Sequence, residues 1–237
     1  MRRLLSLSVV ALVLGFLATP VASAQQTVNF FIGGFVPHSL DARSGDVLYQ
    51  DSTGYYSLST DPAGFDMSAF HGVTVGGEYL VGLTRNFEAG LGLGFYQRSV
   101  DTFYTNVVNS DGTDITQTLK LRIVPFTATV RWLPFGNHNP VQPYVGAGVG
   151  VLIWRYSETG QFVDSSNNIF NANSVGSGAK TGPVVLGGVK LASGPAAFGF
   201  EIRWQDAKAD LPADQGFVGS TIDLGGFNYL FTVGFRF

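Results

Sequence analysis

Residues 226–237 read GFNYLFTVGFRF, and their large apolar side chains stand at every second position. Because side chains along a β-strand point alternately to its two faces, one face of this stretch is apolar and the other is small or polar. Six large apolar residues on one face, the last at position 237, fit contact with lipid better than packing in a crowded soluble core. The stretch therefore predicts a membrane-spanning β-strand whose apolar face is Phe227, Tyr229, Phe231, Val233, Phe235 and Phe237.

The first 24 residues have the order of a secretory signal peptide. Two arginines precede an apolar run at 4–16, and an A-x-A cleavage site follows at 22–24. The apolar run is shorter than the roughly 20 residues that a helical membrane span needs. We therefore expect residues 1–24 to be cleaved and residues 25–237 to form one barrel domain.

The composition favours a β-barrel over other classes of exported protein. The chain has 31 Gly and 20 Phe, only 13% charged residues and no Cys. A closed barrel is held by the hydrogen bonds between its strands and needs no disulfides. Without residues 1–24, 12 Lys and Arg remain against 17 Asp and Glu, and this negative balance argues against nucleic acid as a partner.

Eight segments carry strand-like alternation, and the connections between them alternate in length. Outer-membrane barrels have an even number of strands, short periplasmic turns and longer outer loops. We therefore expect an all-β fold, an eight-stranded antiparallel up-and-down transmembrane β-barrel with both termini periplasmic. The expected strands are 27–37, 71–83, 87–100, 116–133, 141–157, 179–191, 196–206 and 226–237, the short turns 84–86, 135–140 and 193–195, and the long loops 38–70, 101–115, 158–178 and 208–224.

The fourth segment changes its pattern at Val124 and Pro125. Before this point Leu, Leu and Ile alternate with Lys120 and Arg122, and after it Ala, Val and Trp alternate with Thr and Arg131. Because proline donates no hydrogen bond to a β-ladder, the change predicts a β-bulge here.

Charged residues on the non-aromatic faces are expected in the lumen, where they must be paired or hydrated. Two interpretations stay open: a network that plugs the barrel, or a gated polar pore. Counting registers from the turn at 84–86 puts Glu78 opposite Gly92 and Arg122 opposite Gly94, which predicts an ion pair between Glu78 and Arg122 above a floor of glycines. The expected lumen residues are Glu78, Glu88, Arg98, Lys120, Arg122, Arg131, Lys190, Glu201, Arg203 and Arg236.

Three short motifs carry a family resemblance: GFVP at 34–37, QPYVGAG at 142–148 and GFRF at 234–237. With the strand pattern, they make the chain similar to the small eight-stranded bacterial outer-membrane barrels of the OmpX, OmpW and OmpA transmembrane-domain type, also grouped as opacity-like or porin-like proteins. The terminal strand resembles the carboxy-terminal signal for barrel insertion. The resemblance implies a monomer without cofactor, a bilayer with lipopolysaccharide as its surroundings, and insertion machinery and periplasmic chaperones as assembly partners.

Neither a catalytic nor a metal site is expected. None of the three histidines, His38, His71 and His138, has a serine two residues away on its own face, as an activated nucleophile would need. His38 and Asp41 alone offer too few ligands for a metal. The leading hypothesis is a porin-like or OmpW-like protein that passes or binds small solutes. The alternative is a plugged scaffold whose surface loops mediate adhesion or other surface interactions.

Overall fold

The computed structural model describes residues 25–38, 67–164, 166, 168–217 and 219–237. The expected signal peptide, most of the expected first loop and Asp41 lie outside these residues. Within the described ranges, no helix is long and apolar enough to cross a membrane.

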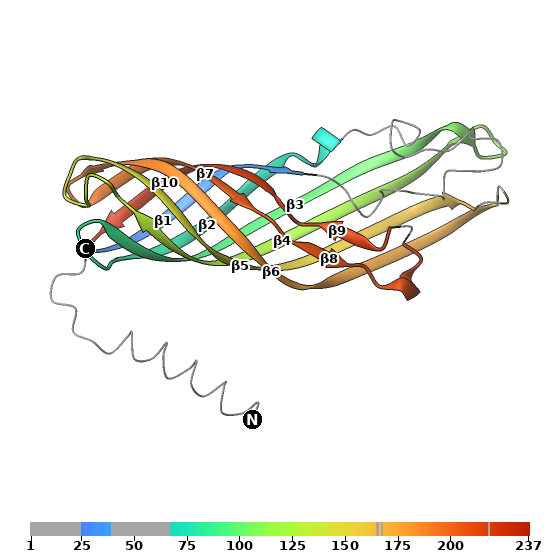
Figure 1. The fold of residues 1–237 in the computed structure, drawn as a ribbon. Helices are drawn as coiled ribbons and strands as arrows, with labels where there is room; N and C mark the ends of the chain where they lie inside the picture. Colours follow the sequence, from blue (N-terminus) through green and yellow to red (C-terminus); the bar gives the residue numbers. More distant parts are fainter. Residues whose placement is uncertain (1–24, 39–66, 165, 167, 218) are drawn as a thin grey trace, which may run out of the picture.

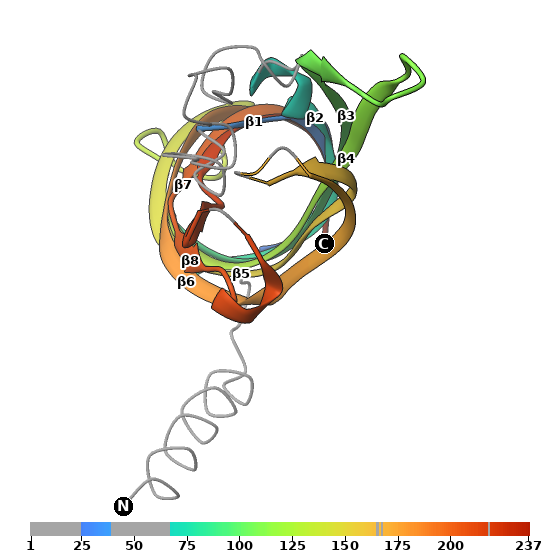
Figure 2. The ribbon, with the colours of Figure 1, turned by 90° about the vertical axis from the view of Figure 1, so that its right-hand side faces the viewer.

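Eight antiparallel strands close into one barrel, which confirms the expected fold class (Figures 1 and 2). The ring runs in the order β1-β10-β7-β6-β5-β4-β3-β2, so the first and last strands pair and close it. At the end with the short turns, the amide N of Gln26 donates to the carbonyl O of Phe237 over 3.0 Å. The barrel strands are β1 (Gln26–Pro37), β2 (Gly72–Gly82), β3 (Phe87–Val108), β4 (Asp114–Trp132), β5 (Val141–Val163), β6 (Ile169–Ser193), β7 (Ala196–Gln205) and β10 (Gly226–Arg236).

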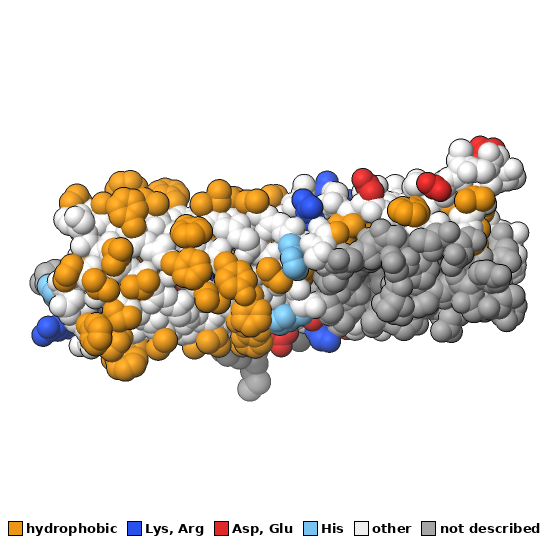
Figure 3. Space-filling model, turned by 90° about the horizontal axis from the view of Figure 1, so that it is seen from above, with side chains coloured by type: hydrophobic (Ala, Val, Ile, Leu, Met, Phe, Trp, Pro, Cys, Tyr) orange, Lys and Arg blue, Asp and Glu red, His pale blue; other side chains and the backbone are white. Residues whose placement is uncertain are grey.

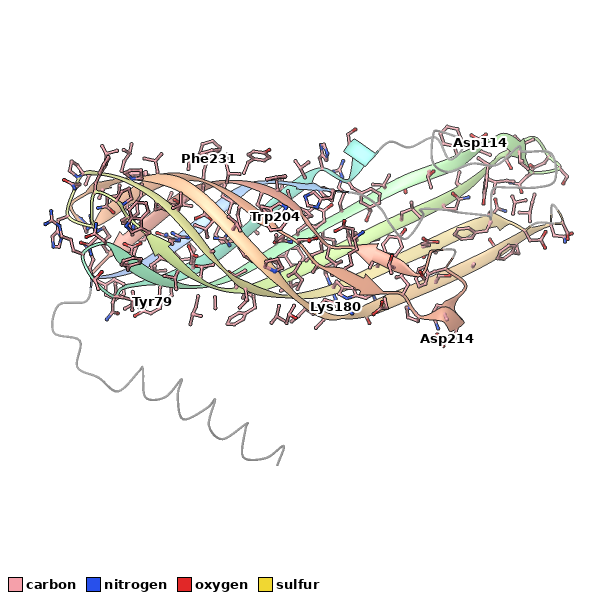
Figure 4. The ribbon with its side chains drawn as sticks, viewed as in Figure 1. Tyr79, Asp114, Lys180, Trp204, Asp214 and Phe231 are labelled. Atoms are coloured by element: carbon pink, nitrogen blue, oxygen red, sulfur yellow. The ribbon has the colours of Figure 1, made fainter. Side chains whose placement is uncertain are left out.

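At the end of the barrel with the short turns, apolar side chains cover the outer surface (Figure 3); this surface is called the apolar coat below. Large apolar side chains point outward from its strands, and Figure 3 shows them gathered on this part of the wall, with most charged side chains beyond it. Figure 4 shows two of them, Tyr79 and Phe231, pointing away from the barrel. This pattern, apolar outside and polar inside, is that of a barrel wall in lipid.

Strands β3 to β6 are 19–25 residues long, whereas β1, β2, β7 and β10 have 10–12 residues. A tilted strand crosses a bilayer in about 9–11 residues, so the four long strands continue well beyond the apolar coat. The expected loops at 101–115 and 158–178 are therefore mostly strand, with short connections at 109–113 and 164–168. Their polar residues suggested loops because a strand in water carries polar side chains outside.

Strand β4 contains no bulge at Pro125, so that prediction was wrong. Leu93 pairs with Phe126 and Tyr96 with Ile123 in one unbroken register, and the irregularity between β3 and β4 falls at 103–108 instead. Odd-numbered side chains of β4 point inward along the whole strand. At Pro125 the polarity of both faces changes. Between Pro125 and the short turn, the inward side chains of β4 are polar and the outward ones apolar. On the other side of Pro125, the inward side chains are mostly apolar and the outward ones mostly polar.

Beyond the apolar coat the barrel interior is an apolar core. The predicted loop at 208–224 contains β8 (Lys208–Asp210), η5 (Ala213–Gln215) and β9 (Thr221–Asp223), and β8 and β9 pair as a separate two-stranded sheet. Ile222 and Leu224 pack in the same core as Trp154 of β5 and Phe70 of η4 (Met67–Phe70). This part of the molecule is built like a soluble protein, apolar inside and polar outside.

Candidate functional site

A layer of buried ion pairs crosses the lumen at the level of the apolar coat. The Nη2 atom of Arg131 on β4 contacts Oε2 of Glu78 on β2, and lies 2.8 Å from Oε2 of Glu201 on β7. The side chain of Arg131 is 1% exposed, and those of its two partners 2% and 1%. Because these strands stand apart in the ring, the contacts bridge the lumen from wall to wall.

A second arginine completes this arrangement. Arg203 Nη2 lies 2.7 Å from Oε1 of Glu201 and 3.5 Å from Oε1 of Glu78. The hydroxyl of Tyr144 donates to Oε2 of Glu201 over 3.0 Å, and the guanidinium of Arg131 lies over the Tyr144 ring at 4.7 Å. Both carboxylates therefore face two guanidinium groups, which is how buried charges are stabilised.

Closer to the short-turn end, Lys190 on β6 reaches Glu88 on β3. Its Nζ donates to both carboxylate oxygens, at 2.8 and 2.9 Å, and both side chains are 7% exposed. Three carboxylates thus face three cations in the lumen, and the layer carries no net formal charge.

Glycines on the inner wall make room for these side chains. A Cβ on Gly92 would lie 2.7 Å from the Thr127 hydroxyl and 3.8 Å from Nη1 of Arg203. A Cβ on Gly188 would lie 2.7 Å from the Tyr144 hydroxyl. Of the glycines expected to form the floor, Gly90 and Gly92 lie against Glu78 and Gly92 also lies near Arg203, whereas Gly94 faces Pro125 and Phe31.

The structure places six of the ten expected lumen residues together and separates the other four. The six are Glu78, Glu88, Arg131, Lys190, Glu201 and Arg203. Arg236 is half-buried near the short turns, where it donates to the carbonyl of Asn137 over 3.0 Å. Arg98 is exposed, and its Nε donates to the carbonyl of Ala69 over 2.8 Å.

Lys120 and Arg122 lie on the outer wall, so their assignment to the lumen was wrong. Glu78 does lie opposite Gly92, as expected, but Arg122 lies opposite Gln97 and not Gly94. The predicted ion pair between Glu78 and Arg122 therefore does not form, and Arg131 takes that place. The error came from applying the rule for a strand in lipid, polar side chains inward, to a part of β4 that lies in water, where polar side chains point outward.

The outer wall holds a hollow of about 190 Å³ that the sequence did not reveal as a site. Its lining combines three exposed cations from two neighbouring strands with two polar residues. Arg155 is the one cation of the three that was not expected as a site residue from the sequence, and it lies opposite Arg122 because β4 pairs with β5. The lining residues are Gln97, Lys120, Arg122, Arg155 and Ser157.

Two further polar groups lie where the barrel meets the β8–β9 hairpin. Ligand atoms of His38, Asp206 and Asp223 lie within 4.8 Å of one another, a grouping hidden in the sequence because its members are far apart along the chain. Lys180 Nζ lies 2.9 Å from Oδ2 of Asp210. A hydrogen bond from Lys180 lowers the pKa of the Asp210 carboxyl.

The six residues of the expected insertion signal all point outward from β10. Phe231 is 66% and Phe237 69% exposed, and these side chains form part of the apolar coat. Cross-strand contacts add to their packing, since the Phe231 and Phe200 rings meet edge to face with centroids 5.4 Å apart.

Comparison with known proteins identifies the fold through solved structures. No protein-family model matches the chain, and no curated protein matches it. Among solved structures, the outer membrane protein OprG from Pseudomonas aeruginosa is similar with a TM-score of 0.52 and 14% identity, over 91% of this chain and 96% of that chain.

Neisserial surface protein A is similar with a TM-score of 0.44 and 13% identity, over 91% of this chain and 99% of that chain. The E. coli outer membrane protein W gives a TM-score of 0.40 and 15% identity, over 92% of this chain and 100% of that chain. With the closed ring, the apolar coat and the polar lumen, the likeness to OprG shows that this chain has the fold of the small eight-stranded outer-membrane β-barrels.

Proposed function

We propose that this chain is a closed, non-enzymatic outer-membrane scaffold, which acts through its outer surface and its water-exposed end and passes no solutes. The sequence favoured solute passage over a plugged scaffold; the buried ion pairs in the lumen support the scaffold instead. The observation that carries the proposal is the bridge from Glu78 through Arg131 to Glu201, with side chains at most 2% exposed. A conducting pore needs hydrated side chains along its path, and these charges are shielded from water by each other.

The apolar core supports the same proposal. On the far side of the ion pairs, Leu121, Leu152 and Ile222 pack together and are each at most 1% exposed. A solute would have to displace this core as well as the ion pairs. The four long strands then serve to hold the far end of the barrel away from the membrane surface, where it can meet partners. We place both termini on the periplasmic side and expect a monomer.

Single-channel recording in planar bilayers tests this function. The purified barrel is expected to insert without discrete openings, because the ion-paired side chains that cross the lumen are buried. A known porin inserted under the same conditions shows that the recording detects openings. Discrete, reproducible openings of this barrel would overturn the proposal and restore solute passage as its function.

Deleting Phe237 tests the proposed insertion signal. Its side chain is exposed beyond the end of β10, and its backbone forms one pair of hydrogen bonds with Gln26 at the edge of the barrel, so its loss should change folding in detergent only slightly. In cells the shortened chain should accumulate unfolded in the periplasm, because the insertion machinery would recognise it poorly. Heat-modifiable gel migration measures the folded fraction in both settings.

The matched control for this deletion is Phe135→Ala, which removes an exposed phenyl ring from a short turn. This variant should fold in cells like the wild type. Equal folded fractions in cells for the deletion and the wild type would show that Phe237 is no part of a signal.

A further inference from the structure

Three cations lie in adjacent rows of the outer wall just beyond the apolar coat. Arg122 on β4 lies directly opposite Arg155 on β5, and Lys120 lies opposite Ser157 in the next outward row. Directly opposed like charges destabilise a sheet unless an anion lies between or above them. In the described part of the chain, none of the three forms an ion pair with a carboxylate. The wall therefore presents concentrated positive charge.

The level of these cations matches that of lipid headgroups. The outward residue before Arg122 toward the membrane is Val124, and the one before Arg155 is Ile153, which is 51% exposed and part of the apolar coat. Two residues along a strand span about 7 Å. The cations thus begin within one step of the surface that faces acyl chains.

An apolar groove of about 530 Å³ runs down the lipid-facing wall from this level. Gly77 of β2 lies between Phe30 of β1 and Leu93 of β3, so a missing side chain leaves a gap between two large apolar neighbours. A Cβ on Gly77 would approach no atom closer than 3.3 Å, so the gap is open to the outside.

The groove and the basic hollow lie next to each other along β3 and β4. Phe95 and Val124 line the upper part of the groove, and the next outward residues on the same two strands, Gln97 and Arg122, line the hollow. A ligand that fills both must join an anionic group, at the headgroup level, to a long apolar chain. The polar lining of the hollow provides guanidinium and ammonium donors, the groups that proteins use to bind phosphate.

We propose that this face binds the lipid A part of lipopolysaccharide, with a phosphate of its phosphorylated sugars against Lys120, Arg122 and Arg155 and an acyl chain in the groove beside Gly77. The proposal rests on the proposed function for its orientation, since lipopolysaccharide lies in the outer leaflet and the long strands must then point outward.

The test measures lipid binding to the purified full chain in mild detergent by native mass spectrometry. The probes are diphosphorylated lipid A, the same lipid with its phosphates removed, phosphatidylglycerol and inorganic phosphate. Removing the cations in a Lys120→Gln, Arg122→Gln, Arg155→Gln variant should weaken binding of diphosphorylated lipid A about tenfold or more, since charge-assisted hydrogen bonds are lost. The dephosphorylated lipid should bind the variant and the wild type equally.

A control variant removes three cations elsewhere, in Arg85→Gln, Lys180→Gln and Lys208→Gln, and should bind lipid A as the wild type does. Gly77→Phe fills the groove without changing charge and should weaken both forms of lipid A. Heat-modifiable migration confirms that each variant is folded before binding is measured.

Equal affinity of the wild type and the Lys120, Arg122, Arg155 variant for diphosphorylated lipid A would overturn the proposal. So would an equal loss of phosphatidylglycerol binding, which would indicate general attraction to anionic lipid, or displacement of lipid A by inorganic phosphate alone. None of these outcomes changes the conductance result, so failure of this site and failure of the proposed scaffold function are separable.

Discussion

Replacing Arg131 by Met is expected to lower the free energy of unfolding by about 3–5 kcal/mol, the largest effect expected of any single substitution in the lumen. The change removes the cation between Glu78 and Glu201, and both carboxylates are then buried with one arginine fewer. Met fills a similar volume, so the loss reports charge and hydrogen bonding more than a cavity. Urea unfolding in lipid vesicles, followed by tryptophan fluorescence, measures it.

The matched control is Arg122→Met, which removes an exposed arginine from the same strand. Its effect should stay within about 1 kcal/mol, because exposed charges contribute little and the residue opposite it is another cation, Arg155. In a double-mutant cycle, adding Glu78→Gln to Arg131→Met should cost less than the sum of the single changes, because the two side chains interact. Additive effects, or equal sensitivity at positions 122 and 131, would show that the lumen is not held by these pairs.

Replacing Leu91 by Arg is expected to cost about 2–4 kcal/mol, because the side chain points into the lipid near the middle of the apolar coat. Leu91 is 52% exposed and lies between Tyr79 and Ala128 on the neighbouring strands. Its exposure in the structure is thus exposure to lipid. The same unfolding titration in vesicles gives the change in free energy.

Ser99→Arg is the control on the same face of the same strand. Ser99 lies opposite Lys120, beyond the apolar coat, so an arginine there should cost at most about 1 kcal/mol, from repulsion within an exposed pair of like charges, and clearly less than at position 91. If Ser99→Arg were as costly as Leu91→Arg, lipid would reach far along β3 and the level assigned to the membrane surface would be wrong.

Most of the fold could be predicted from the sequence where strands lie in lipid. Lipid forces apolar residues outward and the narrow lumen forces small or polar ones inward, so β10 and β2 were recognised within a residue or two of their ends. Beyond the apolar coat the rule inverts, and residues such as Lys120 and Thr159 were taken for lumen or loop. The pattern around Pro125 already showed this exchange of polar and apolar faces. It was interpreted as a bulge, whereas it marks the level where the outer wall passes from lipid to water.

The sequence predicted which charged side chains point into the lumen, but not which of them form ion pairs with each other. Alternation alone assigned Glu78, Arg131 and Glu201 to the lumen, because each lies on the small and polar face of a strand in the membrane. Their contacts cross the ring and depend on how β7 closes against β10 and β1, which no local count of residues supplies. Short turns fix the register of neighbouring strands, and for this reason the pairing of Glu78 with Gly92 was predicted correctly.

The measurement that tests the change of polarity most directly is spin-label accessibility along β5. The chain has no cysteine, so single cysteines can be introduced and labelled at the outward positions 147, 149, 151, 153, 155, 157 and 159 in the barrel reconstituted in vesicles. Labels at 147–153 should be more accessible to oxygen, which dissolves in lipid, and labels at 155–159 to a water-soluble nickel chelate. A preference for oxygen that continues through 159, or one for nickel that begins before 151, would contradict a barrel that passes from lipid to water beside Arg155.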